Sequence, residues 1–464
     1  MNATGCFRVL ELTIARGLIV VIASVLTPTI TSAQGIQRSG SATEAASELR
    51  RAADLLQSGK LDEAEPILRH VLVSNPNNAD AHNLLGIVLD QRGKAKEAER
   101  EYRMALTLNP KAISPRANLG VLLARTKRDD EAIQSFESVL RLAPDHPQAT
   151  INLGLLYASR SDYAGAAKLL TRANELQPNT FDILYHLGVA LYHLNRFDEA
   201  ARAIETASSL SPNSAEPFYL LGLIASSQGQ DKKAGDYWEE ALALRPIYPE
   251  VNFALGELLQ KRQRYQSARE FYERALQQDP SQPAYYARLG GVYMLLRSFE
   301  PALEVFQRAT QRFPENADMH YFVALAARGA ANFDLAQTSL RKALSVQPNH
   351  IDALALLGSI ISDRGDSAEA EKLLRRAVAL NDKHFNAHHD LGRLLVRARR
   401  YDEAIPILQR AAMLDADDPD VHYQLFLALS RLKRKEEAER ELAIYKQLTD
   451  GDKAAPGERK PKKQ

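Results

Sequence analysis

The chain has 464 residues, with 59 Lys and Arg against 58 Asp and Glu, so its formal net charge is +1. So balanced a charge offers no overall electrostatic footprint for nucleic acid, and this excludes nucleic acid as an expected partner. The single cysteine, Cys6, lies near the N-terminus. If an N-terminal leader is removed, the mature chain carries no thiol, which is compatible with an oxidising exterior.

Residues 1–33 have the pattern of a secretory signal. Arg8 and Arg16 precede an apolar run at residues 17–26, and small residues follow up to Ala33. Because the run is shorter than the ~20 apolar residues of a membrane span, we expect cleavage after Ala33. The mature protein is then exported and is periplasmic or secreted. The alternative is an uncleaved segment that anchors the chain to the inner membrane.

The segment at residues 34–44 is rich in Gly, Ser and Gln and is expected to be a flexible leader. After it the sequence repeats every 34 residues, from Ala45 to Asp452. One glycine series on this period is Gly86, Gly120, Gly154, Gly188, Gly222, Gly256, Gly290, Gly358 and Gly392. An alanine series twelve positions later is Ala64, Ala98, Ala132, Ala166, Ala200, Ala234, Ala268, Ala302, Ala336, Ala370, Ala404 and Ala438. A fixed period of this size predicts a helical repeat array.

One repeat, residues 79–112, shows why these residue types recur. Its two apolar stripes at helical spacing are Leu84, Leu85, Val88 and Leu89, and then Ala98, Tyr102, Ala105 and Leu106. Gly93, between the stripes, predicts a residue in the left-handed conformation that ends the first helix, and Pro110 ends the second helix. Each repeat is therefore expected to be helix, turn, helix, turn. Small residues at positions 8 and 20 let the helices approach, and a large residue at position 24 fills the remaining space.

The motif within each repeat is specific. Leu-Gly occupies positions 7 and 8 in nine repeats, and position 32 is proline nine times in succession, from Pro76 to Pro348. The chain resembles the tetratricopeptide-repeat family in these features. The resemblance implies an all-α, right-handed superhelical solenoid of twelve antiparallel helix pairs over residues 45–452. It also implies a protein-binding scaffold without catalysis or a cofactor.

The two ends of the array depart from the pattern. Arg51 at position 7 of the first repeat, and Phe426 and Tyr445 in the last, are typical of terminal repeats that have no neighbour on one side. The tail at residues 453–464 is basic and contains Pro and Gly. It is expected to be a disordered solubilising end, and a specific anionic partner is the alternative.

A search for an enzyme site leaves one candidate. The sequence has no phosphate-binding glycine loop, no paired cysteines and no Gly-x-Ser-x-Gly turn. His384 and His388 have i, i+4 spacing, so an enzyme or enzyme subunit with a metal site there is the alternative function. However, His350 precedes His384 by one repeat. His82, His320 and His422 share position 4 with His388. This recurrence favours a structural role, and we expect no metal.

In tetratricopeptide repeats the first helices line a concave inner surface, chiefly through positions 2, 5, 9, 12 and 13. The candidate groove residues selected on this basis are Asn118, Val121, Ile151, Asn152, Leu155, Tyr185, Val189, Tyr192, Tyr219, Leu223, Phe253 and Tyr321. Most are apolar or aromatic, and exposure of such residues marks an interaction site. Burial by superhelical curvature or by a neighbouring repeat is the alternative. Asn118 and Asn152 are expected to hydrogen-bond the backbone of a bound segment.

The resemblance also excludes one ligand type and indicates a partner class. The lysines with which some family members clamp terminal carboxylates are missing. Farther along, the inner wall is expected to be basic, through Arg328, His389, Arg393, Arg397 and Arg431. We therefore expect a non-catalytic scaffold or adaptor of the cell envelope that holds an extended or helical segment of a protein or peptide. A special case is an envelope assembly or secretion factor. Membrane contact is expected only through a partner or an uncleaved signal, and the sequence identifies neither the partner nor the oligomeric state.

Overall fold

The structure is a computed structural model that describes residues 40–451. The chain divides into two compact halves on either side of the Pro246–Ile247 bond. The N-terminal half is described over residues 40–246 and the C-terminal half over residues 247–451. The described residues form 24 α-helices and no strand, so the predicted all-α repeat array is confirmed.

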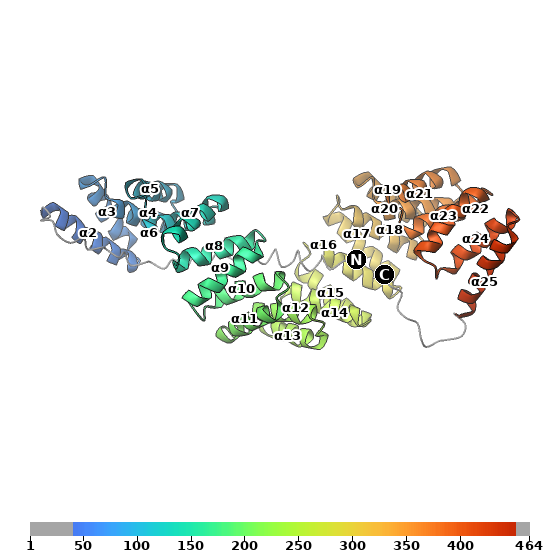
Figure 1. Ribbon diagram of the computed structural model, residues 1–464, viewed down its shortest axis with the longest axis horizontal. Helices are drawn as coiled ribbons and strands as arrows, with labels where there is room; N and C mark the ends of the chain where they lie inside the picture. The colour runs from blue at the N-terminus through green and yellow to red at the C-terminus, as the bar shows by residue number, and fades with distance from the viewer. Residues whose placement is uncertain (1–39, 452–464) are drawn as a thin grey trace. The chain divides into compact units, whose positions relative to one another are not determined.

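The first helices of the repeats carry even labels in Figure 1. They are α2 (Gly40–Gln57), α4 (Ala79–Gln91), α6 (Ile113–Arg125), α8 (Pro147–Ser159), α10 (Phe181–His193) and α12 (Ala215–Ser227) in the N-terminal half. In the C-terminal half they are α14 (Pro249–Lys261), α16 (Pro283–Leu295), α18 (Ala317–Gly329), α20 (Ile351–Asp363), α22 (Phe385–Arg397) and α24 (Pro419–Arg431). From the second repeat onward, each begins at position 1 of the 34-residue repeat.

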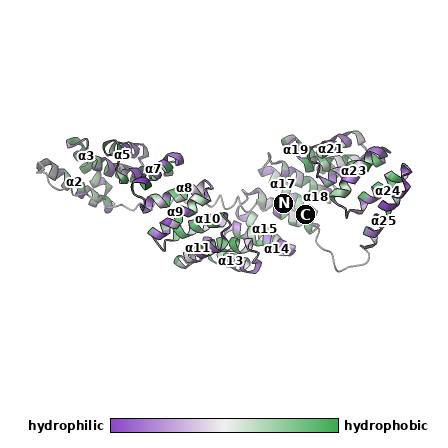
Figure 2. Ribbon diagram, viewed as in Figure 1, coloured by the Kyte–Doolittle hydropathy of each residue, from purple (hydrophilic) through white to green (hydrophobic). Residues whose placement is uncertain are grey.

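The second helices carry odd labels. They are α3 (Leu61–Ser74), α5 (Ala95–Leu108), α7 (Asp129–Leu142), α9 (Tyr163–Leu176), α11 (Phe197–Leu210) and α13 (Asp231–Leu244). In the C-terminal half they are α15 (Tyr265–Gln278), α17 (Phe299–Arg312), α19 (Phe333–Val346), α21 (Ser367–Leu380), α23 (Tyr401–Leu414) and α25 (Lys435–Gly451). Apolar residues follow the facing sides of paired helices and polar residues the outer sides (Figure 2).

The turn inside each repeat has the same backbone in all twelve copies. Gly93 has φ 75°, as its place after α4 predicts. Three further glycines and eight other residues occupy the equivalent position in the left-handed region, among them Lys127 (φ 64°) and Ala331 (φ 59°). Because this conformation costs ~1–2 kcal/mol for an L-residue, the register of the repeat imposes a backbone that eight of the twelve sequences do not favour.

Close packing within each repeat follows the predicted positions. All twelve alanines at position 20 are buried. A Cβ placed on Gly222 would lie 2.2 Å from Nε1 of Trp238, and one placed on Gly86 would lie 2.6 Å from Cε1 of Tyr102. Since each of these large side chains comes from position 24 of the same repeat, the glycine at position 8 provides the space that the aromatic ring fills.

Position 4, where the family has tryptophan, holds hydrogen-bonding side chains in several repeats. His82 Nε2 is 2.9 Å from the Pro76 carbonyl oxygen, and His320 Nε2 is 2.9 Å from that of Pro314. In each case the carbonyl belongs to position 32 of the preceding repeat. A polar side chain at position 4 therefore ties the first helix to the turn before it.

The expected boundaries need one correction. Helix α2 begins at Gly40, so residues 40–44 are helical and do not belong to a flexible leader. Helix α2 continues without interruption into the first repeat, and the Ala, Glu and Leu residues of α2 from Glu44 onward favour helix. The predicted signal at residues 1–33 and the tail at residues 453–464 lie outside the described residues. Within residues 40–451, no helix is both long enough and apolar enough to span a bilayer.

Candidate partner-binding surface

The inner face of the N-terminal half is built from first helices. Helices α6, α8, α10 and α12 pack side by side, each against the next. They carry the candidate residues from Asn118 to Leu223, whereas Phe253 and Tyr321 belong to the C-terminal half.

Six of the twelve candidate residues are buried in the folded chain. They are Ile151, Asn152, Val189, Tyr219, Leu223 and Phe253, with exposed fractions of 7% or less. The expectation that these side chains are exposed on the inner surface is wrong. The alternative stated with it, burial by a neighbouring repeat, applies to them.

The packing of position 5 explains the burial of Ile151 and Phe253. Ile151 lies in a cluster with Ile183, at position 3 of the following repeat. Phe253 stands in the same relation to Tyr285, with ring centroids 4.9 Å apart. A side chain at position 5 therefore points into the contact between successive first helices. The Asn152 amide donates to the Gln148 carbonyl at 2.9 Å, so this buried amide is satisfied within its own helix.

Five candidate residues remain partly exposed on the inner face of the N-terminal half: Asn118, Val121, Leu155, Tyr185 and Tyr192. We call them the neutral face. The ring of Tyr185 stacks on Phe181 with centroids 5.8 Å apart, and burial raises the pKa of the Tyr185 hydroxyl. The Asn118 amide donates to Asn83 Oδ1 at 3.1 Å. The side-chain oxygen of Asn118 can then accept a hydrogen bond from a ligand, and the side-chain amide of Asn83 can donate one.

Charge is nearly absent from α8, α10 and α12, whereas α6 carries Arg116, hydrogen-bonded to Ser138, and Arg125, paired with Asp90. Helix α8 has no charged residue, and α10 and α12 have one carboxylate each, Asp182 and Glu216, both in the first turn. Burial lowers the pKa of His186 on α10 and of His146 before α8, so both imidazoles are neutral at neutral pH. The neutral face therefore suits a ligand surface that is apolar or uncharged.

The inner face of the C-terminal half is different in character. A hollow of about 370 Å³ lies among α18, α20 and α22, and polar side chains form most of its wall. The candidate residue Tyr321 lines it and is partly exposed. Burial, with the charge of Asp352, raises the pKa of Tyr321 to about 12.

The predicted basic wall is largely neutralised in the structure. Arg397 lies 2.9 Å from Asp363, and His389 Nε2 lies 2.7 Å from Asp420. Arg393 contacts Asp390 at 3.2 Å and Asp363 at 3.5 Å. Only Arg328 and Arg431 of the five predicted residues have no ion-pair partner among the described residues. The expectation of an overall basic wall is therefore wrong.

His389 nevertheless titrates unusually. Burial alone would lower the pKa of its imidazole. The hydrogen bond with Asp420 and the charges of Asp390, Asp420 and Asp418 outweigh burial and raise the pKa above its ordinary value. The same bond lowers the pKa of Asp420. The bond thus favours the charged form of both groups.

His384 and His388 do not converge on a common point. His384 caps α22, because its Nδ1 accepts the Ala387 N–H at 3.0 Å, and its Nε2 lies 3.0 Å from Asp352 Oδ1. His388 is buried, with Nδ1 3.1 Å from the His384 carbonyl oxygen. No group of three or more His, Cys, Asp or Glu side chains within residues 40–451 could hold a metal ion. His350 caps α20 in the same manner as His384, which agrees with a structural role.

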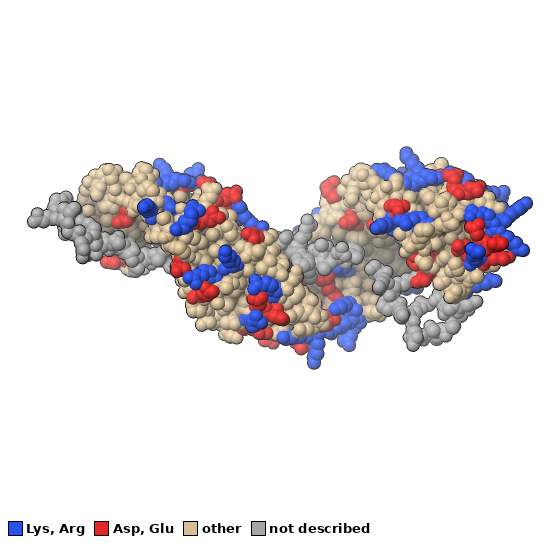
Figure 3. All heavy atoms as spheres, in the orientation of Figure 1, with Lys and Arg blue, Asp and Glu red and all other residues tan. Residues whose placement is uncertain are grey.

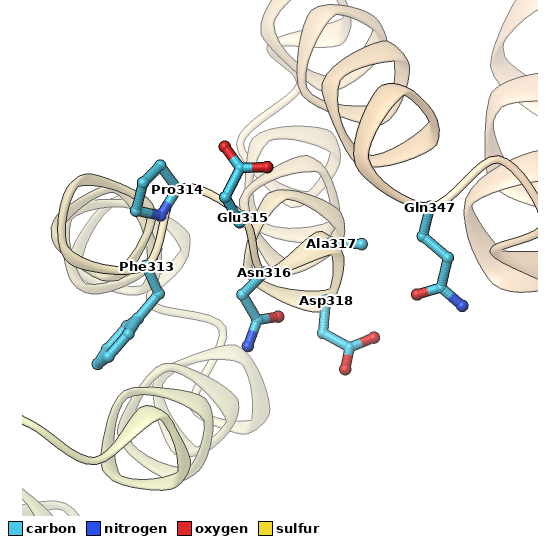
Figure 4. A pocket seen from close by; sticks show the side chains of 7 residues that line it. All are labelled: Phe313, Pro314, Glu315, Asn316, Ala317, Asp318 and Gln347. Atoms are coloured by element: carbon cyan, nitrogen blue, oxygen red, sulfur yellow. The ribbon is translucent and has the colours of Figure 1, made fainter.

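A second hollow, of about 460 Å³, lies at the turn before α18 (Figure 4). Asn316, Asp318 and Gln347 point to one side of it, and Glu315 points away. Asn316 is occupied in capping α18 at Met319, and Asp318 lies 3.0 Å from His350. Since the polar groups of this hollow serve turns that recur in the array, it does not form a distinct site.

These features define a helical repeat protein. Three models described as tetratricopeptide repeat match the chain: one at residues 225–289, 259–326, 362–423 and 395–455, another at 49–113, 151–215 and 324–385, and a third at 114–146. The chain belongs to the tetratricopeptide repeat family, and this membership indicates a protein-interaction scaffold with protein or peptide partners.

No curated protein matches the sequence significantly. The Cut9–Hcn1 hetero-tetramer of the APC/C is 14% identical over 87% of this chain and 93% of that chain, with a TM-score of 0.44. Yeast Tom70 is 16% identical over 89% and 100%, with a TM-score of 0.38. Pseudomonas aeruginosa pilF is 24% identical over 47% and 100%, with a TM-score of 0.42.

Sequence reasoning did not bring Asp352, Asp363 and Asp390 together with the basic residues of the C-terminal half. These residues occupy positions 2, 13 and 6 of their repeats, on the same helix faces as the basic residues that were identified. Their pairing could have been found from the repeat register, because Arg397 and Asp363 are one full repeat apart.

Proposed function

We propose that this protein is a non-catalytic scaffold or adaptor of the cell envelope, exported by its N-terminal segment. An extended or helical segment of a partner protein lies along the concave inner surface of the first helices. In the N-terminal half the contact is made by the neutral face, with Tyr185 and Tyr192 as the main anchors.

The observation that carries this proposal is the partial exposure of two tyrosines on α10 beside Leu155 on α8, in a region almost free of charge. On the side of the molecule seen in Figure 3, Lys, Arg, Asp and Glu are distributed over both halves. Aromatic side chains whose rings are held by neighbours lose little entropy on binding, and such residues commonly supply most of the affinity of an interface.

Affinity capture tests the proposal. The mature chain, from Gln34 onward, is immobilised and incubated with an envelope extract, in parallel with a Tyr185→Ala, Tyr192→Ala variant. Leu210→Ala is the matched control, because Leu210 is 43% exposed but belongs to the second helix α11. We expect one main partner that the tyrosine variant fails to capture and the control retains. Equal capture by all three proteins would reject the neutral face as the binding surface.

Export is tested independently. N-terminal sequencing of the protein isolated from cells is expected to begin at Gln34. Intact Met1 on protein that sediments with membranes would support the anchored form instead.

A further inference from the structure

The hollow among α18, α20 and α22 is more than a gap between helices, because its wall contains charges of both signs in a fixed arrangement. Its volume of about 370 Å³ corresponds to about a dozen water molecules. This is room for a long side chain together with part of the backbone that carries it. The hollow lies wholly within the C-terminal half, whereas the neutral face belongs to the N-terminal half.

The acidic side of the hollow is incompletely compensated. Asp390 is largely buried at its wall, with Arg393 as its nearest cation at 3.2 Å. The same Arg393 is also shared with Asp363. Burial raises the pKa of Asp390 despite the opposing charges of Arg393 and His389 and a hydrogen bond with Ser359. A further positive charge from a ligand would therefore be favoured here.

The acidic side also has accessible oxygens. The side chain of Asp352 is 58% exposed, and only its Oδ1 is in contact with His384, at 3.0 Å. Tyr321 lines the same hollow. A carboxylate oxygen and a phenolic oxygen beside a buried carboxylate are suitable acceptors for an ammonium or guanidinium group.

The hollow also carries a cation that would attract a negatively charged group of a ligand. This cation is Arg328, at the end of α18. Its side chain lines the hollow, is exposed and has no ion-pair partner within residues 40–451. The other arginine that lines the hollow, Arg393, is already paired with Asp363 and Asp390. Arg328 is thus the one cation of the hollow available for an anionic group of a ligand.

We propose that this hollow binds a peptide segment that carries a basic side chain and an acidic group close to each other. The basic side chain enters toward Asp352 and Asp390, and the acidic group pairs with Arg328. This inference rests on the proposed scaffold function and names the ligand chemistry of its C-terminal half. The charge pattern of the site then selects among partner segments, since a segment with only one of the two charges leaves part of the wall unpaired.

A selection from a library of random twelve-residue peptides tests this inference on the whole mature chain. We expect enriched peptides that contain Lys or Arg within a few residues of Asp or Glu. Their dissociation constants, measured by fluorescence anisotropy, should rise about 10-fold or more when the basic residue is replaced by norleucine or the acidic residue by glutamine. Binding should also weaken on raising the salt concentration, because both contacts are partly exposed to solvent.

Charge reversal provides the decisive comparison. Arg328→Glu breaks no side-chain hydrogen bond or ion pair within residues 40–451, so the fold should be retained. It should weaken the selected peptides about 10-fold or more, and replacing the peptide's acidic residue by lysine should restore binding. Arg431→Glu is the matched control, since Arg431 is likewise exposed and unpaired in the described structure but lies outside the hollow. It should change nothing.

The outcomes separate this inference from the proposed function. One outcome is that the selected peptides bind the Arg328→Glu variant as tightly as the wild type and fail to bind the Tyr185→Ala, Tyr192→Ala variant. That result would overturn the charged site and leave the scaffold function intact. Peptides indifferent to both sets of substitutions would overturn both. A selection that enriches no peptide would also contradict the inference drawn for the hollow.

Discussion

Gly222→Ala is the substitution whose effect the packing determines most sharply. A methyl group at Gly222 would lie 2.2 Å from Nε1 and 2.4 Å from Cδ1 of Trp238, whereas non-bonded heavy atoms rest at ~3.5–4.0 Å. The indole cannot move aside freely, because it is buried and its N–H donates to the Tyr219 carbonyl at 3.2 Å. The two helices of the repeat must therefore separate, or the indole must lose its hydrogen bond.

The expected cost follows from these contacts. Overpacking of this kind costs ~1–3 kcal/mol, and loss of the indole hydrogen bond would add ~0.5–1.5 kcal/mol. Alanine gains ~1 kcal/mol over glycine in a helix. We expect a net destabilisation of about 1–3 kcal/mol. Gly291→Ala in α16 is the matched control, because a Cβ there meets no atom within 4 Å. The control should be stabilised by up to ~1 kcal/mol.

Urea denaturation followed by circular dichroism measures both variants. Trp238 is the only tryptophan of the chain, so its fluorescence reports on the affected repeat directly. The reasoning would be refuted by a Gly222→Ala protein whose unfolding midpoint equals or exceeds that of the wild type, or by equal shifts in the two variants.

Three further predictions concern stability. Ala331→Gly should raise the free energy of unfolding by about 0.5–1 kcal/mol, because Ala331 has φ 59° and glycine adopts this backbone without strain; an unchanged urea midpoint would contradict this. The His384→Ala, His388→Ala variant should lose about 1–2 kcal/mol through the lost cap of α22 and leave metal content, measured by mass spectrometry, unchanged. Stoichiometric zinc in the wild type that disappears in this variant would revive the metal-enzyme alternative. Acidification from pH 7.5 to 5.5 should weaken the hydrogen-exchange protection of the N-terminal half, where burial lowers the pKa of His146. The contribution of His146 to the free energy of unfolding is present above about pH 6.5 and is lost as the pH falls through the folded-state pKa. The contribution of His389, whose pKa is raised, is present below about pH 6.5 and lost as the pH rises through the folded-state pKa, so a His389→Gln variant should remove this dependence from the C-terminal half.

The repeat register alone predicts most of the architecture, for a physical reason. Position 8 must be small where position 24 is large, as Gly222 and Trp238 show, and position 15 must adopt a left-handed backbone, as at Gly93. These constraints act within one repeat, so they appear in the sequence at a fixed spacing. The helix bounds from the second repeat onward follow from them.

Burial on the inner face could not be predicted in the same way. Ile151 and Tyr185 both occupy position 5, yet Ile151 is buried against Ile183 while Tyr185 is partly exposed. Side-chain length does not decide the outcome, because Tyr219 also occupies position 5 and is buried. The difference therefore depends on how the following repeat packs against each residue.

The most direct test of the central claim compares affinity and stability in the same variants. The captured partner segment is titrated against the wild type, Tyr185→Ala with Tyr192→Ala, and Tyr219→Ala, and the unfolding midpoint of each protein is measured. Truncating a central aromatic anchor costs ~2 kcal/mol or more, which is about 30-fold in affinity. We predict that the first variant loses at least this affinity with little change in its midpoint. Tyr219→Ala, at a buried position, should lower the midpoint and retain affinity while folded. A double-tyrosine variant that unfolds readily but still binds the partner would contradict the account.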